Sequence, residues 1–191
     1  MSKDRTAVDR EIEAASKEVV ALRKRIAALR KERPAEPVKD YAFQGPDGAV
    51  TLTQLFRGKR DLMVIHNMGT TCPMCTLWAD GFNGILPHIE DRCAFVVSSP
   101  DAPDVQRAFA EPRGWRFRMV STKGTTFAKD MGYEKDGKPW PGVSVFQMRD
   151  GRPARVGDAG FGPGDDFGPM FNLMNLFPEG QDGWWPKFRY A

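Results

Sequence analysis

The stretch Leu62-Met63-Val64-Ile65-His66-Asn67-Met68-Gly69-Thr70-Thr71-Cys72-Pro73-Met74-Cys75 joins a short apolar run to two cysteines spaced C-x-x-C. The apolar run Leu62–Ile65 is typical of a buried β-strand. Pro73 directly follows the first cysteine, and proline is favoured at the first position of a helix. The stretch therefore predicts a strand-to-helix corner, with Cys72 at the helix entrance and Cys75 about one turn inside.

A dithiol at a helix N-terminus is suited to thiol–disulfide exchange. Two thiols at this spacing can close into one disulfide, and the helix N-terminus lowers the pKa of the first thiol. The same spacing also occurs in half of a zinc site, or as two core thiols without chemistry. The motif by itself leaves all three interpretations open.

The composition favours a soluble cytoplasmic protein with no nucleic-acid or membrane partner. The chain has 191 residues and a formal net charge of only +3, and its basic residues crowd into the first 33 positions. No stretch reaches the roughly 18 apolar residues of a membrane span, and no apolar signal segment is present. Three cysteines are too few for a secreted disulfide framework, so the close pair is expected to be catalytic or metal-binding.

Residues 1–33 predict one long amphipathic helix. Its apolar positions step by alternating fours and threes, which is a heptad pattern: Val8, Ile12, Ala15, Val19, Leu22, Ile26 and Leu29. The helix is either a dimerising coiled coil or an arm that docks on its own or a neighbouring subunit's globular domain. Pro34 and Pro37 end the helix. We expect a folded domain over residues 38–191 and a homodimer formed through or with the helix.

Strands and helices alternate along the folded domain. The predicted strands cover residues 49–52, 62–68, 93–97, 117–121, 143–146 and 153–156, and the predicted helices cover 53–56, 105–110, 127–131 and 166–177. Gly84 and Pro87 should break the helix that begins after Cys72. Alternation of this kind predicts an α/β fold with a parallel core sheet. The Asp150-Gly151 turn adds an antiparallel hairpin, so the central sheet is mixed and flanked by helices.

Two further motifs carry a family resemblance. The dithiol together with Trp140-Pro141-Gly142-Val143-Ser144-Val145-Phe146 resembles the thioredoxin superfamily, whose members carry a cis-proline before the strand that faces the active site. Pro141 is the matching position. Cys72-Pro73-Met74-Cys75, followed by the block Trp78–Gly84 and then Leu86-Pro87-His88, resembles the DUF899 family of thioredoxin-like proteins, which are predicted dithiol–disulfide oxidoreductases. Gly114–Phe117 and Asn172–Asn175 add to this resemblance.

The resemblance implies a thioredoxin-like fold and assigns roles to six residues. Cys72 would be the nucleophile and Cys75 the resolving thiol, as the helix position also suggests. Pro141, Pro73, Trp78 and Trp140 are the expected substrate-binding residues. The substrate would be a disulfide or thiol on a protein or a small molecule. No cofactor and no resident metal are expected.

The lead-in to the dithiol departs from two related families. Thioredoxins have an aromatic approach to the first cysteine, whereas this chain has Asn67–Thr71. Peroxiredoxins carry a threonine three residues before the peroxidatic cysteine, and that position is Gly69 here. The sequence therefore argues against hydroperoxide reduction by the peroxiredoxin mechanism.

Two other classes of function compete with the oxidoreductase. The dithiol with Met63, Met68, Met74 and His66 forms a set of soft ligands that would suit Cu(I). A non-catalytic interaction module would instead use the N-terminal helix. We expect a structural role for His66, a surface position for His88 and a core position for Cys93.

Overall fold

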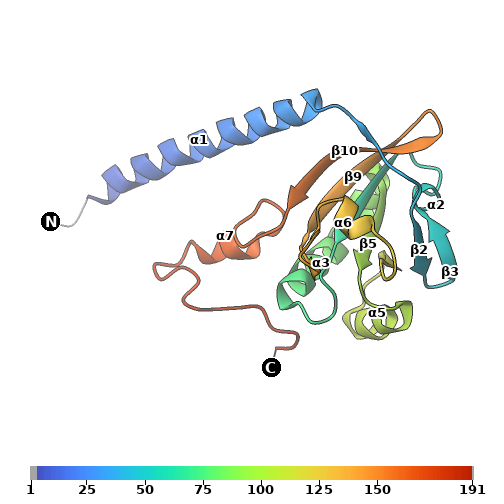
Figure 1. Ribbon diagram of the computed structural model, residues 1–191. Helices are drawn as coiled ribbons and strands as arrows, with labels where there is room; N and C mark the ends of the chain where they lie inside the picture. The colour runs from blue at the N-terminus through green and yellow to red at the C-terminus, as the bar shows by residue number, and fades with distance from the viewer. Residues whose placement is uncertain (1–3, 191) are drawn as a thin grey trace. The chain divides into compact units, whose positions relative to one another are not determined.

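The computed structural model describes residues 4–190 of the chain, so residues 1–3 of the expected arm and residue 191 of the expected domain lie outside it (Figure 1). The described chain divides into two compact units, with the division between Ala35 and Glu36. The first unit contains α1, Arg5–Glu32, which begins after Asp4, whose carboxylate accepts a hydrogen bond from the Thr6 N–H. The predicted long N-terminal helix is confirmed.

The second unit is built on one eight-stranded mixed sheet with the strand order β1-β10-β9-β4-β5-β6-β2-β3. Strands β4, β5 and β6 run parallel, and β9 pairs with β4 in the antiparallel direction. The strands are β1 Glu36–Pro37, β2 Ala42–Gly45, β3 Gly48–Thr51, β4 Asp61–His66, β5 Ala94–Ser99, β6 Arg118–Ser121, β9 Gly142–Arg149 and β10 Arg152–Gly160. A separate small hairpin consists of β7 Glu134–Lys135 and β8 Lys138–Pro139.

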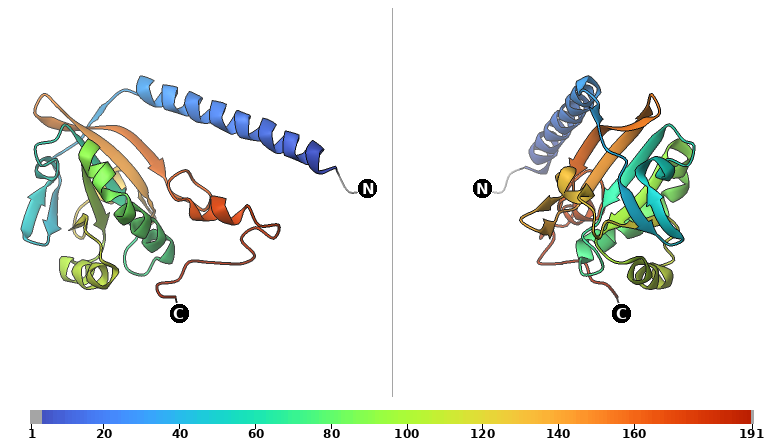
Figure 2. Two further views of the ribbon diagram at one scale, coloured as in Figure 1. Left: turned by 180° about the vertical axis from the view of Figure 1, so that it is seen from behind. Right: turned by 45° about the vertical axis from the view of Figure 1, so that its right-hand side comes forward.

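The helices of this unit are short. They are α2 Leu52–Leu55, α3 Pro73–Gly84, α4 Leu86–Arg92, α5 Pro103–Ala110, α6 Phe127–Asp130 and α7 Met170–Met174, with a 3₁₀ turn at Glu111–Arg113. As predicted, the helix that begins after Cys72 breaks near Gly84, and α4 has Pro87 in its first turn. Figure 2 shows α3 and α4 along one face of the sheet. The α/β fold expected from the sequence is confirmed.

Side chains from the two faces of the sheet build two separate cores, because successive residues of a strand point to opposite faces. The first core contains Tyr41, Phe43, Leu52, Leu55, Leu62, Val64, Val96, Val120, Phe127, Tyr133 and Phe146. The second core contains Ile65, Cys72, Met74, Cys75, Trp78, Phe82, Phe95, Val97, Phe117, Val143 and Phe171. The dithiol therefore belongs to the face that α3 covers.

The closing helix is shorter than predicted. The sequence pattern indicates a helix over 166–177, but only Met170–Met174 is helical. The Asp165 side chain accepts hydrogen bonds from the N–H groups of Gly162, Phe167 and Gly168, which fixes a turn where the helix was expected to begin. At the other end Leu176 and Phe177 are exposed, so no buried face extends the helix.

The sheet begins two residues before the domain start expected at Val38. Strand β1 pairs with β10 through Glu36 and Arg155, and their side chains form an ion pair with an N–O distance of 2.5 Å. The sequence contains no periodic signal for a two-residue strand.

No helix within residues 4–190 is long and apolar enough to cross a membrane.

Candidate dithiol site

The two cysteines lie where strand β4 passes into helix α3, as the sequence predicts. Cys72 is the residue that precedes the helix, and its Sγ accepts a hydrogen bond from the Cys75 N–H at 3.1 Å. The Cys72 carbonyl oxygen accepts hydrogen bonds from the N–H and the hydroxyl of Thr76. Pro73 is the first helical residue, where its missing N–H removes no helical hydrogen bond. The Sγ atom of Cys72, the candidate nucleophile, therefore lies beside the backbone N–H groups of the first turn of α3.

The two thiols have opposite protonation tendencies. The Cys75 thiol donates a hydrogen bond to Cys72, and this bond is the largest of the effects that lower the pKa of Cys72 to about 7. Burial of Cys72 opposes this shift, whereas hydrogen bonds from the N–H groups of Cys75 and Met74 add to it. The same bond holds the proton on Cys75 and, together with burial, raises the pKa of Cys75. Both cysteines are free thiols, and their exposed fractions are 7% and 3%. Near neutral pH the pair therefore consists of a partly ionised outer thiol and a protonated inner thiol.

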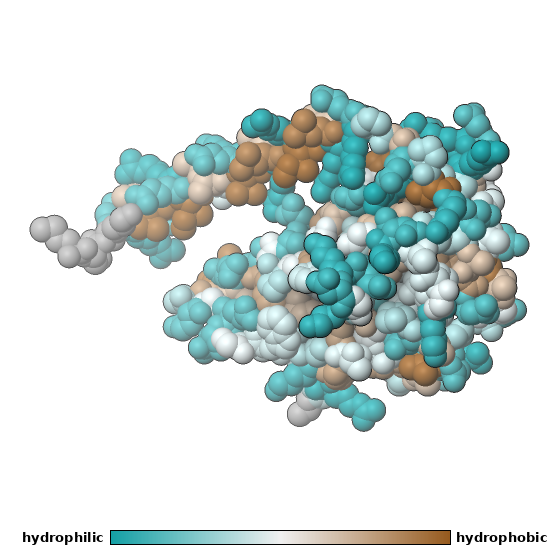
Figure 3. Space-filling view, viewed as in Figure 1, coloured by the Kyte–Doolittle hydropathy of each residue, from teal (hydrophilic) through white to brown (hydrophobic). Residues whose placement is uncertain are grey.

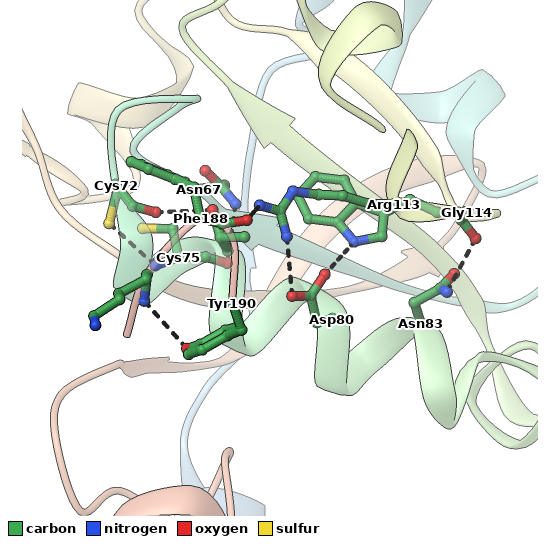
Figure 4. A network of polar contacts seen from close by, with 12 residues as sticks. Asn67, Cys72, Cys75, Asp80, Asn83, Arg113, Gly114, Phe188 and Tyr190 are labelled. Atoms are coloured by element: carbon green, nitrogen blue, oxygen red, sulfur yellow. Dashed lines mark hydrogen bonds and ion pairs between the residues drawn. The ribbon is translucent and has the colours of Figure 1, made fainter. Parts of the chain in front are cut away.

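Asn67 ties the loop before the dithiol to the helix after it (Figure 4). Its side-chain oxygen accepts the Gly69 N–H at 2.8 Å, and its side-chain nitrogen donates to the Cys75 carbonyl oxygen at 3.4 Å. The Asn67 backbone N–H also donates to the carbonyl oxygen of Ser98, in the next strand. The sequence shows Asn67 only as a non-aromatic residue in the lead-in, and no local pattern indicates that it connects three segments.

Asp101 explains the glycine at position 69. The Asp101 carboxylate accepts hydrogen bonds from the Thr70 N–H at 2.9 Å and from the Ser99 hydroxyl at 3.2 Å. Gly69 has a φ of 101°, and a Cβ atom added there would lie 2.7 Å from an Asp101 oxygen. A threonine cannot occupy this position without moving Asp101, so the departure from the peroxiredoxin pattern is required by the local structure.

Two polar residues of α3 anchor the loop that precedes β6. Asp80 accepts hydrogen bonds from Trp115 Nε1 at 2.6 Å and from Arg113 at 3.2 Å (Figure 4). Asn83 donates to the Gly114 carbonyl oxygen and accepts the N–H of Arg116. These contacts give the polar residues of the Trp78–Gly84 block a structural role one to two turns away from the thiols.

Pro141 lies at the expected edge of the sheet but not in the expected isomer. It directly precedes β9, whose first residue Gly142 pairs with His66 at the end of β4. The peptide bond between Trp140 and Pro141 is trans, so the cis-proline predicted from the resemblance is wrong. With the trans bond, the backbone on both sides of Pro141 is hydrogen-bonded. The Trp140 N–H donates to the Tyr133 carbonyl oxygen, and the Pro141 carbonyl oxygen accepts a hydrogen bond from the Phe161 N–H.

The other three expected substrate-binding residues differ in accessibility. Trp78 is buried: its ring packs 5.3 Å from the ring of Phe161, and a Cβ atom on Gly168 would lie 3.0 Å from it. Trp140 is 53% exposed, with the Lys135 ammonium 5.5 Å from its ring. Pro73 is half-buried. A surface hollow of about 590 Å³ beside α3 is lined by Asp80, Phe109, Arg113 and Phe188 but by none of these three residues.

His66 lies on the opposite face of the sheet from the dithiol. Its ring stacks between Tyr133 at 3.9 Å and Phe127 at 5.2 Å, in the first core, and its Nε2 is 2.9 Å from the Ser144 hydroxyl oxygen. Burial lowers the pKa of His66 to about 3, so the imidazole is neutral. His66 therefore cannot join the two thiols in the set of ligands considered for Cu(I).

The remaining soft ligands do lie near the thiols. Met63, Met68 and Met74 all pack in or against the second core. Within residues 4–190, no group of three or more His, Cys, Asp or Glu side chains is arranged to hold a metal ion. Cys93 is buried, and burial raises the pKa of its thiol. This is the core position expected for Cys93.

Comparison with known proteins identifies the family of the chain and agrees with its fold. A family model described as "Bacterial protein of unknown function (DUF899)" matches residues 4–189. The chain belongs to the DUF899 family. The resemblance inferred from the Cys72–Gly84 block is therefore confirmed. No match was found among the curated proteins.

Solved structures similar to this DUF899 chain are peroxiredoxins. The peroxidoxin BcpB from Mycobacterium tuberculosis is 21% identical with a TM-score of 0.55, covering 66% of this chain and 84% of its own. The bacterioferritin comigratory protein from Xanthomonas campestris is 17% identical with a TM-score of 0.52, covering 63% and 80%. A cysteine-to-serine mutant of PrxQ from Xylella fastidiosa is 14% identical with a TM-score of 0.57, covering 67% and 85%. At these identities the likeness shows a shared thioredoxin-like fold.

Proposed function

We propose that this DUF899 protein is a thiol–disulfide oxidoreductase, with Cys72 as the nucleophile and Cys75 as the resolving thiol. The observation that carries the proposal is the hydrogen-bonded arrangement of the pair at the start of α3. The Cys72 Sγ accepts a hydrogen bond from the Cys75 N–H at 3.1 Å. The pKa of Cys72 is lowered to about 7, whereas the pKa of Cys75 is raised. A thiolate available near neutral pH is the form that attacks a disulfide.

The reaction proceeds through two exchanges. The Cys72 thiolate attacks one sulfur of a substrate disulfide, which forms a mixed disulfide and releases the other sulfur as a thiolate that takes up a proton. Cys75 then gives its proton to solvent and attacks Cys72 Sγ, which closes the Cys72–Cys75 disulfide and releases the second substrate thiol. The substrate gains two electrons and the dithiol loses two, so a thiol reductant must restore the protein. In the reverse direction the oxidised pair would oxidise a dithiol substrate.

The substrate would approach between the helix entrance and the start of β9. Pro141 is placed at this edge by the pairing of Gly142 with His66, and Trp140 next to it is exposed. We propose Pro141, Trp140 and Pro73 as substrate contacts. Trp78 would take part only after the segment that contains Phe161 and Gly168 moves, because these residues cover its ring. The small exposed fraction of Cys72 favours an extended peptide or a small molecule as the substrate.

The first experiment follows the redox state of the purified protein. After equilibration across a glutathione or dithiothreitol redox series, rapid alkylation and mass spectrometry should show Cys72 and Cys75 lost together as one disulfide. Cys93 should stay a thiol throughout, because it is buried away from the pair. A pair that never forms a disulfide at any redox potential would refute the proposal.

The second experiment assigns the roles of the two thiols. With a disulfide-bonded peptide as substrate, Cys75→Ser should accumulate a mixed disulfide on Cys72, whereas Cys72→Ser should accumulate none; Cys93→Ser is the matched control and should turn over normally. Hydrogen peroxide is offered in a parallel reaction, because the similar solved structures are peroxiredoxins. If peroxide oxidises Cys72 at a peroxiredoxin-like rate and Cys72 does not react with the peptide disulfide, the protein is a peroxidase and the proposed substrate class is wrong.

We also propose that the protein acts as a homodimer that uses α1. The heptad pattern and the exposed apolar residues of this helix support the proposal.

The location of the protein in the cytoplasm stays a prediction from the sequence.

A further inference from the structure

Helix α1 leaves a row of apolar side chains exposed from Ile12 to Leu29. None of its residues is buried, and Ile12, Leu22 and Leu29 have exposed fractions of 60%, 56% and 55%. Figure 3 shows apolar side chains gathered along one side of the helix, with polar side chains around them. A row of this length along a solvated helix is a binding surface that needs a partner. The distribution of charge along α1 bears on which partner fits this row and on the direction in which that partner runs.

The two halves of α1 carry opposite net charges. Between Asp4 and Glu18 there are five acidic and three basic side chains, a net charge of −2. Between Arg23 and Arg33 there are six basic side chains and one acidic side chain, a net charge of +5. A helix with this distribution is complementary to a second copy of itself only when the second copy runs in the opposite direction.

We infer that α1 pairs with α1 of a second copy of the chain as an antiparallel two-helix coiled coil. In the register that pairs the apolar positions from Ile12 to Leu29 with one another, Ile12 packs against the partner's Leu29, and Val19 packs against the partner's Leu22. The small Ala15 packs against the partner's Ile26, which is large, so each layer combines side chains of compatible size. At the edge of the row, Glu18 lies beside the partner's Arg25, and twofold symmetry repeats this opposite-charge pair.

The parallel arrangement is less favourable for the same residues. It would place the two basic halves side by side and bring Arg25 close to the partner's Arg30, a pair of like charges. It would also set Ala15 opposite the partner's Ala15, which leaves a gap in the row. The antiparallel arrangement has neither the contact between Arg25 and the partner's Arg30 nor the gap between the two Ala15 residues.

The first test is the mass of the full-length protein in solution, measured by sedimentation equilibrium. The native protein should have twice the chain mass of 21.4 kDa, or about 43 kDa. Leu22→Asp, within the row, should give a monomer. Val20→Asp is the matched control, because Val20 is similarly exposed but lies outside the row. A native protein that is a monomer at all concentrations overturns the inference, whether α1 then docks on its own chain or on phosphatidylserine vesicles in a cosedimentation assay.

The second test determines the direction of pairing. Arg25→Glu places a carboxylate beside the partner's Glu18 in the antiparallel dimer, and should raise the dimer dissociation constant about tenfold. In a parallel dimer the same substitution replaces a like-charge pair with an opposite-charge pair, so tighter dimerisation would overturn the inference. Adding Glu18→Arg to Arg25→Glu should restore the native dissociation constant in the antiparallel dimer.

Lys24→Glu controls for the change in net charge. Lys24 points away from the row, and neither Lys24 nor Arg25 has a charged residue three or four positions away on α1. The two substitutions therefore have the same effect within one helix. Only Arg25→Glu should change the dissociation constant; an equal effect of Lys24→Glu would show that net charge alone is responsible and would overturn the inference.

Discussion

The hydrogen bond between the two cysteines shifts their pKa values in opposite directions. The Cys75 thiol donates to Cys72, and this bond is the largest of the effects that lower the pKa of Cys72 to about 7. The bond stabilises the Cys72 thiolate, and its loss should shift the ionisation of Cys72 back toward that of an ordinary thiol. The identity of residue 75 thus determines how much thiolate is present at neutral pH.

The rate at which iodoacetamide alkylates Cys72 should rise with pH through a midpoint near 7, because only the thiolate reacts. Cys75→Ala removes the donor and should move the midpoint to higher pH, whereas Cys75→Ser keeps a hydroxyl donor and should move it less. Mass spectrometry of the Cys72 peptide gives the rate directly in both variants, which have no second thiol in the motif. Identical midpoints for the alanine and serine variants would contradict the role of the hydrogen bond.

His66 should make the folded protein less stable in acid. Burial is the main cause that lowers the pKa of His66 to about 3, while the unfolded chain has an ordinary value of 6.5. As the pH falls from 6.5 toward 3, the unfolded chain binds a proton that the folded chain does not bind. The free energy of unfolding should therefore decrease by up to about 1.4 kcal/mol per pH unit over this window from His66 alone.

Urea unfolding at a series of pH values measures this contribution. The His66→Gln variant should lose less stability than the native protein as the pH falls from about 6.5 to about 4. His88→Gln is the control for the loss of a histidine, because His88 is exposed. Equal slopes for all three proteins would mean that His66 takes up its proton in the folded state.

Strands β9 and β10 contain two paired glycines with different surroundings. A Cβ atom on Gly142 would lie 2.1 Å from the Tyr133 ring and 2.6 Å from the Ala159 carbonyl oxygen. The Tyr133 hydroxyl donates to the Val143 and Ala159 carbonyl oxygens, so the ring is held over the start of β9. Gly160 pairs with Gly142 across the strands but has no atom within 4 Å of its added Cβ.

Gly142→Ala should reduce the free energy of unfolding by about 2–3 kcal/mol, because the new methyl group overlaps backbone as well as side-chain atoms. Gly160→Ala should change it by less than about 0.5 kcal/mol. Equal effects of the two substitutions in thermal or urea unfolding would show that the Tyr133 ring moves away at little cost.

Elements with a periodic or local signal could be predicted from the sequence. The heptad pattern predicted α1, and the apolar run followed by Cys72-Pro73 predicted the corner between β4 and α3. Contacts between distant segments have no such signal. The pairing of β1 with β10, and the hydrogen bond from Thr70 to Asp101, depend on residues brought together only by the folded sheet. For α7 the apolar spacing was misleading, because the side chain of Asp165 stabilises a competing turn.

The whole molecule should unfold in two steps, because its two compact units differ in burial. Unit 36–191 contains both cores and all five tryptophans, whereas α1 buries no residue in the single chain. Tryptophan fluorescence should report one transition that is independent of protein concentration. The helical circular dichroism signal should show an additional transition that moves to higher temperature as the concentration rises, because the proposed dimer would stabilise α1. A single coincident transition at all concentrations would contradict this picture.

The contacts of Asn67 affect the lifetime expected for the mixed disulfide of the proposed reaction. By holding Gly69 and the Cys75 carbonyl together, Asn67 limits the relative motion of the two sulfur atoms before any substrate arrives. Each thiol then experiences the other at a high effective concentration, because little chain entropy remains to be lost when the ring closes. The covalent intermediate should consequently be short-lived in the native protein and last longer in Asn67→Ala, even though both thiols are still present.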